Sequence, residues 1–265
     1  MSVPPSLRYE REAWRSGAGL LAAVDEVGRG SLAGPVSVGV VLLEPGCKPG
    51  PVGLRDSKLL TPEARTALVP RIRRWVLEGA VGHASAAEID AVGILRALRL
   101  AAERAVASLS RTPDWVLLDG NHDYLTRRPQ PLLLEFDDGL DALAAAPELE
   151  GGWRCEVPVR TLVKADLKCS SVAAASVLAK TERDALMAEL AASYPAYGWD
   201  SNRGYSAPAH LAALEEHGPC EQHRRSWRLP GQRGPADELA ADELPGWDTE
   251  ASTGEVADER EQELA

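Results

Sequence analysis

Four acidic residues stand where their side chains could act together on one ligand. Asp25 and Glu26 end an apolar run, Asp119 ends a second one, and Asp166 precedes an alanine-rich segment. Four gathered carboxylates repel one another unless cations neutralise them, and hard oxygen ligands favour Mg²⁺ or Mn²⁺. Two such ions about 4 Å apart activate a water and stabilise the leaving oxygen of a phosphodiester. The pattern therefore predicts two-metal hydrolysis.

Each acid also has an ordinary structural explanation. An acidic pair at a strand end is most often a solvated turn, and an acid before a helix compensates the helix dipole. The run before Asp119 is apolar throughout, which favours a central strand whose end lies where ligands gather in α/β sheets. His210, His217 and His223 offer no obvious general base. We therefore expect the attacking water to be activated by metal.

A glycine-rich turn follows the first acidic pair. In Gly28-Arg29-Gly30 the backbone can approach a ligand closely because the glycines have no Cβ, although the motif alone is a weak signal. Leu20–Asp25 and Val36–Leu43 are typical of buried strands on either side of this turn. We expect a hairpin with a functional turn.

The apolar pattern elsewhere predicts a single α/β domain with short strands and several helices. The predicted strands are Ala80–Ala84, Asp114–Asp119 and Val157–Val163. The predicted helices are one starting at Thr61-Pro62-Glu63, a long one over Ala87–Leu109, one from Ser170 or Ser171 to about Ala192, and one capped by Ser206 through Glu216. Between these elements we expect an insertion at about 123–155.

The ends of the chain differ in composition from its middle. Residues 1–17 are polar, contain Pro4-Pro5 and predict an extended arm, and residues 18–228 form the predicted domain. The segment 229–265 has 11 acidic residues and two arginines, so it holds -9 of the net charge of -11 and predicts a disordered acidic tail. Arg224, Arg225 and Arg228 precede it as a predicted basic patch. Inert solubilisation and nucleic-acid mimicry are both open as roles for the tail.

The chain shows no sign of an extracellular or membrane address. Its four cysteines, Cys47, Cys155, Cys169 and Cys220, have neither Cys-x-x-Cys spacing nor a zinc-type pattern, so we expect reduced thiols. No apolar run approaches roughly 18 residues, and the N-terminus has no signal-like segment. We expect a cytoplasmic monomer without a membrane partner.

These motifs together closely resemble the bacterial type 2 ribonucleases H, the ribonuclease HII family. The matching segments lie in family order between about Gly19 and Trp227. They are Val24–Gly30 with Leu32–Val36, Asp56–Leu60, Glu88-Ile89-Asp90, Leu118–Asn121, Lys164-Ala165-Asp166 with Ser171–Lys180, and Arg203-Gly204-Tyr205 with Gly218-Pro219-Cys220.

The resemblance implies a ribonuclease H-like fold, a mixed five-stranded sheet flanked by helices, with a C-terminal helical extension. It implies hydrolysis of RNA in RNA-DNA hybrids and nicking 5′ to single ribonucleotides in duplex DNA, leaving 3′-hydroxyl and 5′-phosphate ends. It places the metal ligands, for Mg²⁺ or Mn²⁺, on Asp25, Glu26, Asp119 and Asp166. It assigns sugar reading to Gly28, Arg29, Gly30 and Tyr205, with Tyr197 as a rival that core packing would explain.

Phosphate contacts and competing functions complete the expectations. Lys58 suits a backbone phosphate and Lys180 is a weaker candidate, while Arg71, Arg73 and Arg74 fit phosphate contact and a solvated face equally well. Gly93 stands where the family usually has asparagine. Ribonuclease HIII shares the carboxylates but carries an N-terminal substrate-binding domain, and a catalytically silent hybrid-binding module is a second alternative.

Overall fold

Five strands form one mixed sheet in the order β3-β2-β1-β4-β5. The computed structural model describes residues 4–127 and 152–231. The strands are β1 (Leu21–Val27), β2 (Val36–Leu43), β3 (Glu78–Ala84), β4 (Trp115–Asp119) and β5 (Val159–Leu162). β1 pairs antiparallel with β2 and parallel with β4, and β4 pairs parallel with β5. The predicted hairpin and the mixed sheet are confirmed.

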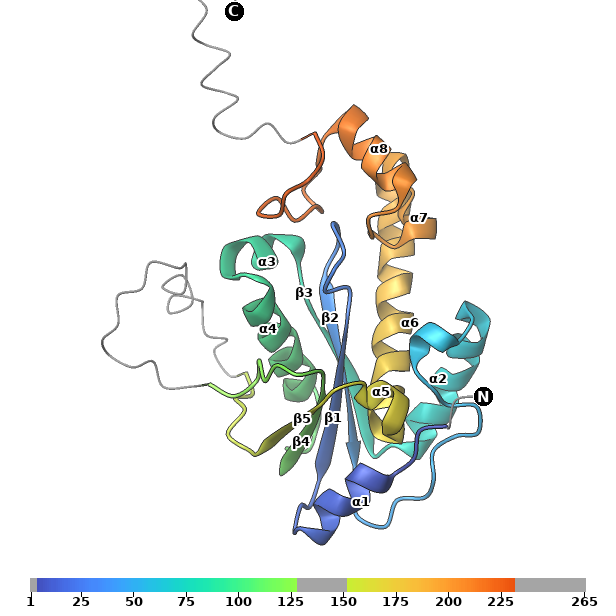
Figure 1. Cartoon of the computed structure of the whole chain (residues 1–265), viewed down its shortest axis with the longest axis vertical. Helices are drawn as coiled ribbons and strands as arrows, with labels where there is room; N and C mark the ends of the chain where they lie inside the picture. The colour runs from blue at the N-terminus through green and yellow to red at the C-terminus, as the bar shows by residue number, and fades with distance from the viewer. Residues whose placement is uncertain (1–3, 128–151, 232–265) are drawn as a thin grey trace, which may run out of the picture. The chain divides into compact units, whose positions relative to one another are not determined.

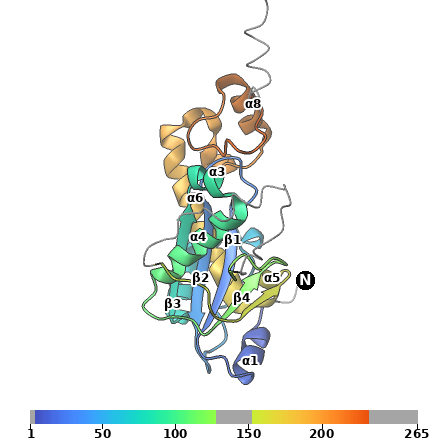
Figure 2. The ribbon, with the colours of Figure 1, turned by 90° about the vertical axis from the view of Figure 1, so that its left-hand side faces the viewer.

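Helices cover both faces of this sheet (Figure 1). Residues that alternate along β1, such as Leu21 and Ala23, pack with α2 (Pro62–Trp75) and α6 (Ser170–Ser193) in one apolar cluster. Their neighbours, Ala22 and Val24, pack with α3 (Ala86–Val92) and α4 (Ile94–Ala107) in another. Figure 2 shows α4 lying over the sheet on the second face. Burial on both faces explains why β1 and β2 are apolar almost throughout.

The C-terminal helical extension builds on the far end of α6. It contains the short helices η3 (Pro195–Tyr197) and α7 (Trp199–Asn202), followed by α8 (Pro208–His217). These elements surround a third apolar cluster with Trp199 and Leu214 at its centre. In Figure 1 this extension lies at the same end of the molecule as the turn between β1 and β2. The remaining short elements are η1 (Ser57–Leu59) and α5 (Ala165–Lys168).

The prediction of an extended N-terminal arm is wrong, because Arg8–Arg15 form helix α1. Glu10 on this helix is fully buried, and its Oε1 accepts hydrogen bonds from the backbone N–H (3.0 Å) and Oγ (2.6 Å) of Ser171. Those donors belong to the first turn of α6, whose N–H groups have no partner within the helix. The N-terminal segment therefore caps the helix that follows Asp166.

Two helix predictions also need correction. The long helix expected over Ala87–Leu109 is two helices, because Gly93 (φ 74°) has a left-handed conformation that ends α3 and starts α4. Ser206 does not cap α8, since the N-cap is Ala207 without a side-chain hydrogen bond.

Most of the predicted insertion, residues 128–151, and the acidic tail from residue 232 lie outside the described residues. In the described part no helix is both long and apolar enough to cross a membrane.

Candidate active site

The sheet register brings the acidic residues to one end of the molecule. Val24 of β1 lies beside Leu118 of the parallel strand β4, so the next residues along the two strands, Asp25 and Asp119, lie at the same end of the sheet. Asp119 pairs in turn with Leu162 of β5, and its Oδ1 accepts a 2.6 Å hydrogen bond from Ala165 N–H. Asp166 is the next residue. Parallel pairing therefore gathers residues that are 141 positions apart in the chain.

Burial and mutual repulsion raise the pKa of three of these carboxyl groups. Burial is the largest cause for Asp25, whose pKa lies well above its usual range, and the charge of Asp119 adds to it. Burial also raises the pKa of Glu26, against the opposing effect of Arg29. For Asp166 the causes are burial and then the charge of Asp119. The charges of neighbouring carboxylates thus contribute to the raised pKa of Asp25, Glu26 and Asp166.

The donor set suits a hard divalent ion, because it offers carboxylate oxygens and neither thiolate nor imidazole. Within residues 4–127 and 152–231, however, no three His, Cys, Asp or Glu side chains are arranged so that they could hold a metal ion. Three of the acids instead contact protein groups: Glu26 pairs with Arg29, Asp166 with Lys58, and Asp119 with Ala165 N–H. Metal binding would have to replace some of these protein partners.

A tyrosine that the sequence analysis did not single out lies against this cluster. Tyr124 is buried, and its hydroxyl donates a 3.4 Å hydrogen bond to Glu26 Oε2. Its pKa is raised well above the usual range by burial and by the charge of Glu26, so the hydroxyl remains a donor. The residue lies in the predicted insertion, which carried no recognisable motif. Only its position in the fold identifies it.

The glycine turn and Tyr205 share a buried arginine that the sequence did not reveal. Arg183 of α6 is fully buried and donates to Pro35 O (2.8 Å), Ser31 Oγ (2.8 Å) and Arg203 O (3.0 Å). Its guanidinium lies 5.5 Å from the centre of the Tyr205 ring. A Cβ on Gly28 would lie 2.1 Å from Arg183 Nε, so only glycine fits there. The turn and Tyr205 therefore form one structural unit.

Arg224 corrects the predicted basic patch, because it is fully buried rather than exposed. Its guanidinium donates to the carbonyl oxygens of Gly28 (2.6 Å), Arg29 (2.7 Å) and Gly34 (3.3 Å). Burial and the charge of Arg183 lower the pKa of Arg224 to about 9. Arg225 and Arg228 are exposed. A run of arginines thus contains one residue that holds the candidate recognition turn from behind.

The other predicted residues are placed as follows. Tyr205 is partly exposed, whereas Tyr197 is buried, donates to Gly218 O and stacks on Trp199, so core packing explains Tyr197. Lys180 donates to Asp184 Oδ1 (2.7 Å) and lies 5.7 Å from the Tyr205 ring centre. Lys58 reaches Asp166. Arg29 Nη1 forms an ion pair with Glu26 Oε1 at 3.3 Å. A Cβ added to Gly30 would meet no other atom within 4 Å.

Two of the histidines, His210 and His223, belong to the buried core of the C-terminal extension. His210 Nε2 and His223 Nε2 lie 3.0 Å apart in the core of the C-terminal extension, and burial lowers the pKa of both, that of His223 to about 4. His210 Nδ1 contacts the carbonyl oxygen of Tyr205 at 2.8 Å. These rings therefore support the segment that carries Tyr205.

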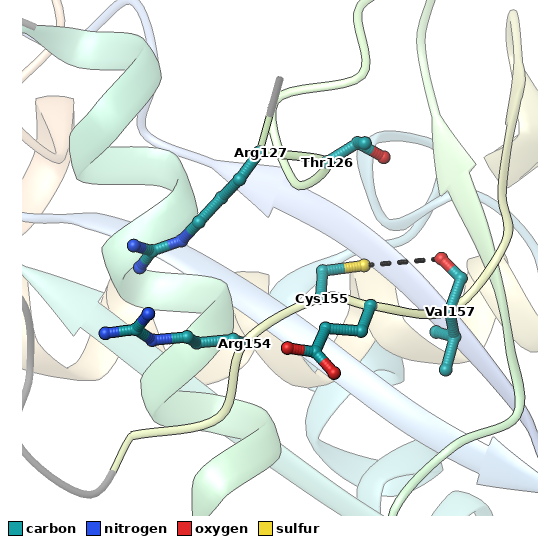
Figure 3. A pocket seen from close by; sticks show the side chains of 6 residues that line it. Thr126, Arg127, Arg154, Cys155 and Val157 are labelled. Carbon is teal, nitrogen blue, oxygen red and sulfur yellow. Dashed lines mark hydrogen bonds between the residues drawn. The ribbon is translucent and has the colours of Figure 1, made fainter. Parts of the chain in front are cut away.

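Figure 3 shows a surface pocket of about 360 Å³ whose lining includes none of the four carboxylates. It is lined by Thr126, Arg127, Arg154, Cys155, Glu156 and Val157. Figure 3 shows Cys155 Sγ directed at Val157 O, a 3.7 Å contact, while the guanidinium groups of Arg127 and Arg154 extend to one side. Arg127 is paired with Glu103 of α4 at 2.9 Å. None of the predicted site residues contributes to this pocket.

A mixed five-stranded sheet with carboxylates at the ends of β1 and β4, beside a buttressed glycine turn and a tyrosine, defines a nuclease of the ribonuclease H-like fold. Comparison with known proteins specifies the family. A family model described as Ribonuclease HII matches residues 22–229. The chain therefore belongs to the ribonuclease HII family, and it is an endoribonuclease that acts on RNA-DNA substrates.

Individual relatives agree with this assignment. A ribonuclease HII of Streptomyces coelicolor is 48% identical over 225 residues, which cover 84% of each chain. One of Paracoccus denitrificans is 43% identical over 223 residues, covering 84% of this chain and 91% of the relative. Among solved structures, the ribonuclease H2 of Pyrococcus horikoshii OT3 has a TM-score of 0.55 at 27% identity and covers 78% of this chain and 93% of its own. Family membership also supports dependence on a divalent metal.

Asp25→Asn is expected to stabilise the metal-free protein at neutral pH by about 1–3 kcal/mol, because it removes a buried carboxylate with acidic neighbours. Folding raises this pKa, so the stability that Asp25 contributes is present at low pH and is lost as pH rises through the raised value. The advantage of the variant should therefore grow from acidic to neutral pH. Thermal unfolding with a chelator, across this pH range, measures it.

Addition of Mg²⁺ or Mn²⁺ provides the control for that experiment. The wild type should then gain stability, since a ligand that binds only the folded state stabilises it. The variant should gain much less. Equal stability of the two proteins at every pH without metal would contradict the prediction.

Proposed function

We propose that Asp25, Glu26, Asp119 and Asp166 are the metal ligands, and that the enzyme nicks duplex DNA on the 5′ side of a single ribonucleotide as well as cutting longer hybrids. The observation that carries this assignment is the parallel register of β1 and β4, which puts two of the acids side by side at one sheet edge. Two bound ions, Mg²⁺ or Mn²⁺, would activate a water and stabilise the leaving 3′-oxygen. The products would carry 3′-hydroxyl and 5′-phosphate ends.

The chain's own residues position the substrate in this proposal. The backbone of Gly28-Arg29-Gly30 offers hydrogen bonds to a 2′-hydroxyl, and the partly exposed ring of Tyr205 stacks on the next deoxyribose. Arg183 supports this role because it touches both the turn and the Tyr205 ring. Together they would hold the RNA-DNA junction in register with the carboxylates.

The two lysines differ in how free they are for a phosphate. Lys58 has a highly exposed side chain, 76%, which suits a phosphate contact. Lys180 already bonds Asp184, which also pairs with Arg65 at 3.1 Å, so its proposed phosphate contact is the weaker of the two. We also propose that the enzyme acts as a cytoplasmic monomer.

Three duplexes test the proposal in Mg²⁺ and in Mn²⁺: DNA with one ribonucleotide, a long RNA-DNA hybrid, and all-DNA of the same sequence. The expected result is one nick 5′ to the ribonucleotide, cuts within the hybrid and none in all-DNA. Tyr205→Ala should weaken the nick at the single ribonucleotide more than cutting of the hybrid, where many registers are equivalent. No 5′ nick in either metal would defeat the proposal.

A further inference from the structure

Two side-chain cations already lie on the proposed metal ligands. Arg29 Nη1 is 3.3 Å from Glu26 Oε1, and Lys58 Nζ is 3.6 Å from Asp166 Oδ2. The side chains of the cations are 43% and 76% exposed, whereas those of the carboxylates are 17% and 7% exposed. The positive charges therefore approach the acids from the solvent side.

The backbone of Lys58 is fixed although its side chain is not. Asp56 Oδ1 accepts a 2.9 Å hydrogen bond from Lys58 N–H, and Arg65 donates to Ser57 O at 3.1 Å. Ser57 Oγ is bonded to Ser176 Oγ of α6 at 2.8 Å. The ammonium, in contrast, is 3.6 Å from its carboxylate, longer than a hydrogen bond. The side chain can thus turn to another anion without moving its base.

The acids around Lys58 hold its ammonium in place by charge. The ammonium lies within ion-pair distance of Asp166, and the carboxylate of Asp56, two residues before Lys58, accepts from the Lys58 backbone. The lysine thus partly neutralises the same cluster that a divalent ion would neutralise.

We propose that Lys58 is an internal counter-ion of the carboxylate cluster: a divalent ion displaces its ammonium from Asp166, and the freed ammonium binds a substrate phosphate. This inference rests on the proposed metal site. Metal binding and substrate binding then strengthen each other. Either one breaks the contact between Lys58 and Asp166, so the other no longer has to break it. In the metal-free protein the same contact keeps Asp166 paired.

Binding of Mn²⁺ alone, measured by calorimetry without nucleic acid, tests the counter-ion role. Lys58→Met should bind Mn²⁺ about three- to tenfold more tightly than wild type. The substitution removes the positive charge of the ammonium, which lies about 4 Å from a proposed ligand and repels the metal ion. Lys58→Arg keeps the charge and should bind like wild type. Lys48→Met, at an exposed lysine outside the cluster, controls for the change in net charge.

Lys58→Met should also bind its substrate less well, because it has lost the ammonium that binds a phosphate. A lysine that only repelled the metal ion would not have this effect. The KM of Lys58→Met for the single-ribonucleotide duplex should rise several-fold at saturating Mn²⁺. Tighter Mn²⁺ binding together with a raised KM supports the exchange. If the wild type binds Mn²⁺ and nicks the duplex but Lys58→Met binds Mn²⁺ equally or more weakly, the counter-ion role of Lys58 is overturned and the proposed metal site is not. A wild type whose Mn²⁺ binding is unaffected by Asp119→Asn overturns the proposed metal site as well.

Discussion

Asp119→Asn is expected to reduce the rate of cleavage by roughly a thousandfold or more, the scale of losing a group that acts in the transition state. The substitution removes one charge at the centre of the cluster, where Asp119 influences Asp25, Glu26 and Asp166. The amide oxygen of asparagine can still accept the hydrogen bond from Ala165 N–H. The fold should therefore survive while metal binding and hydrolysis fail.

A matched control lies at the opposite end of the same sheet. Glu44 directly follows β2, whose Leu43 pairs with Leu21 at the start of β1, so this exposed acid is remote from Asp25 along the strand. Glu44→Gln should nick at the wild-type rate. Initial rates on the single-ribonucleotide duplex, with duplex binding measured in parallel, compare the two variants. Undiminished cleavage by Asp119→Asn would identify the nuclease as a contaminant and favour the silent binding module.

Arg224→Met is expected to destabilise the protein by about 3 kcal/mol, because the carbonyl oxygens that Arg224 serves lose their donor in a buried setting. Methionine retains much of the volume, so the loss should come from hydrogen bonding. Surviving folded protein should also have a raised KM for the single-ribonucleotide duplex, since Gly28-Arg29-Gly30 would no longer be held. Chemical denaturation and steady-state kinetics measure the two effects.

Arg228→Met is the control, since this exposed arginine lies four residues further on. It should change the free energy of unfolding by less than about 0.5 kcal/mol. Arg224→Lys should recover part of the stability, because one ammonium can reach some but not all of the carbonyl groups. Equal stability of Arg224→Met and Arg228→Met would contradict the assigned role of Arg224.

The carboxylate pattern could be predicted from the sequence because it depends on local signals. The apolar run before Asp119 ends where β4 ends, whereas β1 continues past Asp25 to Val27, and parallel pairing brings both acids to one end of the sheet. The mixed five-stranded sheet, which was implied by the resemblance to the ribonuclease HII family, is confirmed. The assignment of those acids as metal ligands stays a prediction. Its basis was the order of the motifs, and the structure adds the protein partners of Glu26, Asp119 and Asp166.

The arginines that hold the recognition turn could not be found in this way. Arg224 and Arg228 look alike in sequence, and only contacts with carbonyl oxygens 190 or more positions away decide that one is buried. Glu10 was missed for a similar reason, because its partner Ser171 is 161 positions distant. From local sequence a charged residue is predicted to be exposed to solvent. Burial of such a residue depends on partners that are distant in the sequence, and the sequence does not identify them.

The dependence of the turn on Arg224 orders events during biosynthesis. A ribosome that has released the chain through Asp166 has already delivered all four acids, but the guanidinium behind Gly28 arrives only 58 residues later. A nascent or prematurely terminated chain would thus contain the proposed metal ligands before the residue that holds the proposed ribose-recognition turn. The proposed recognition of ribose therefore requires synthesis of almost the whole domain.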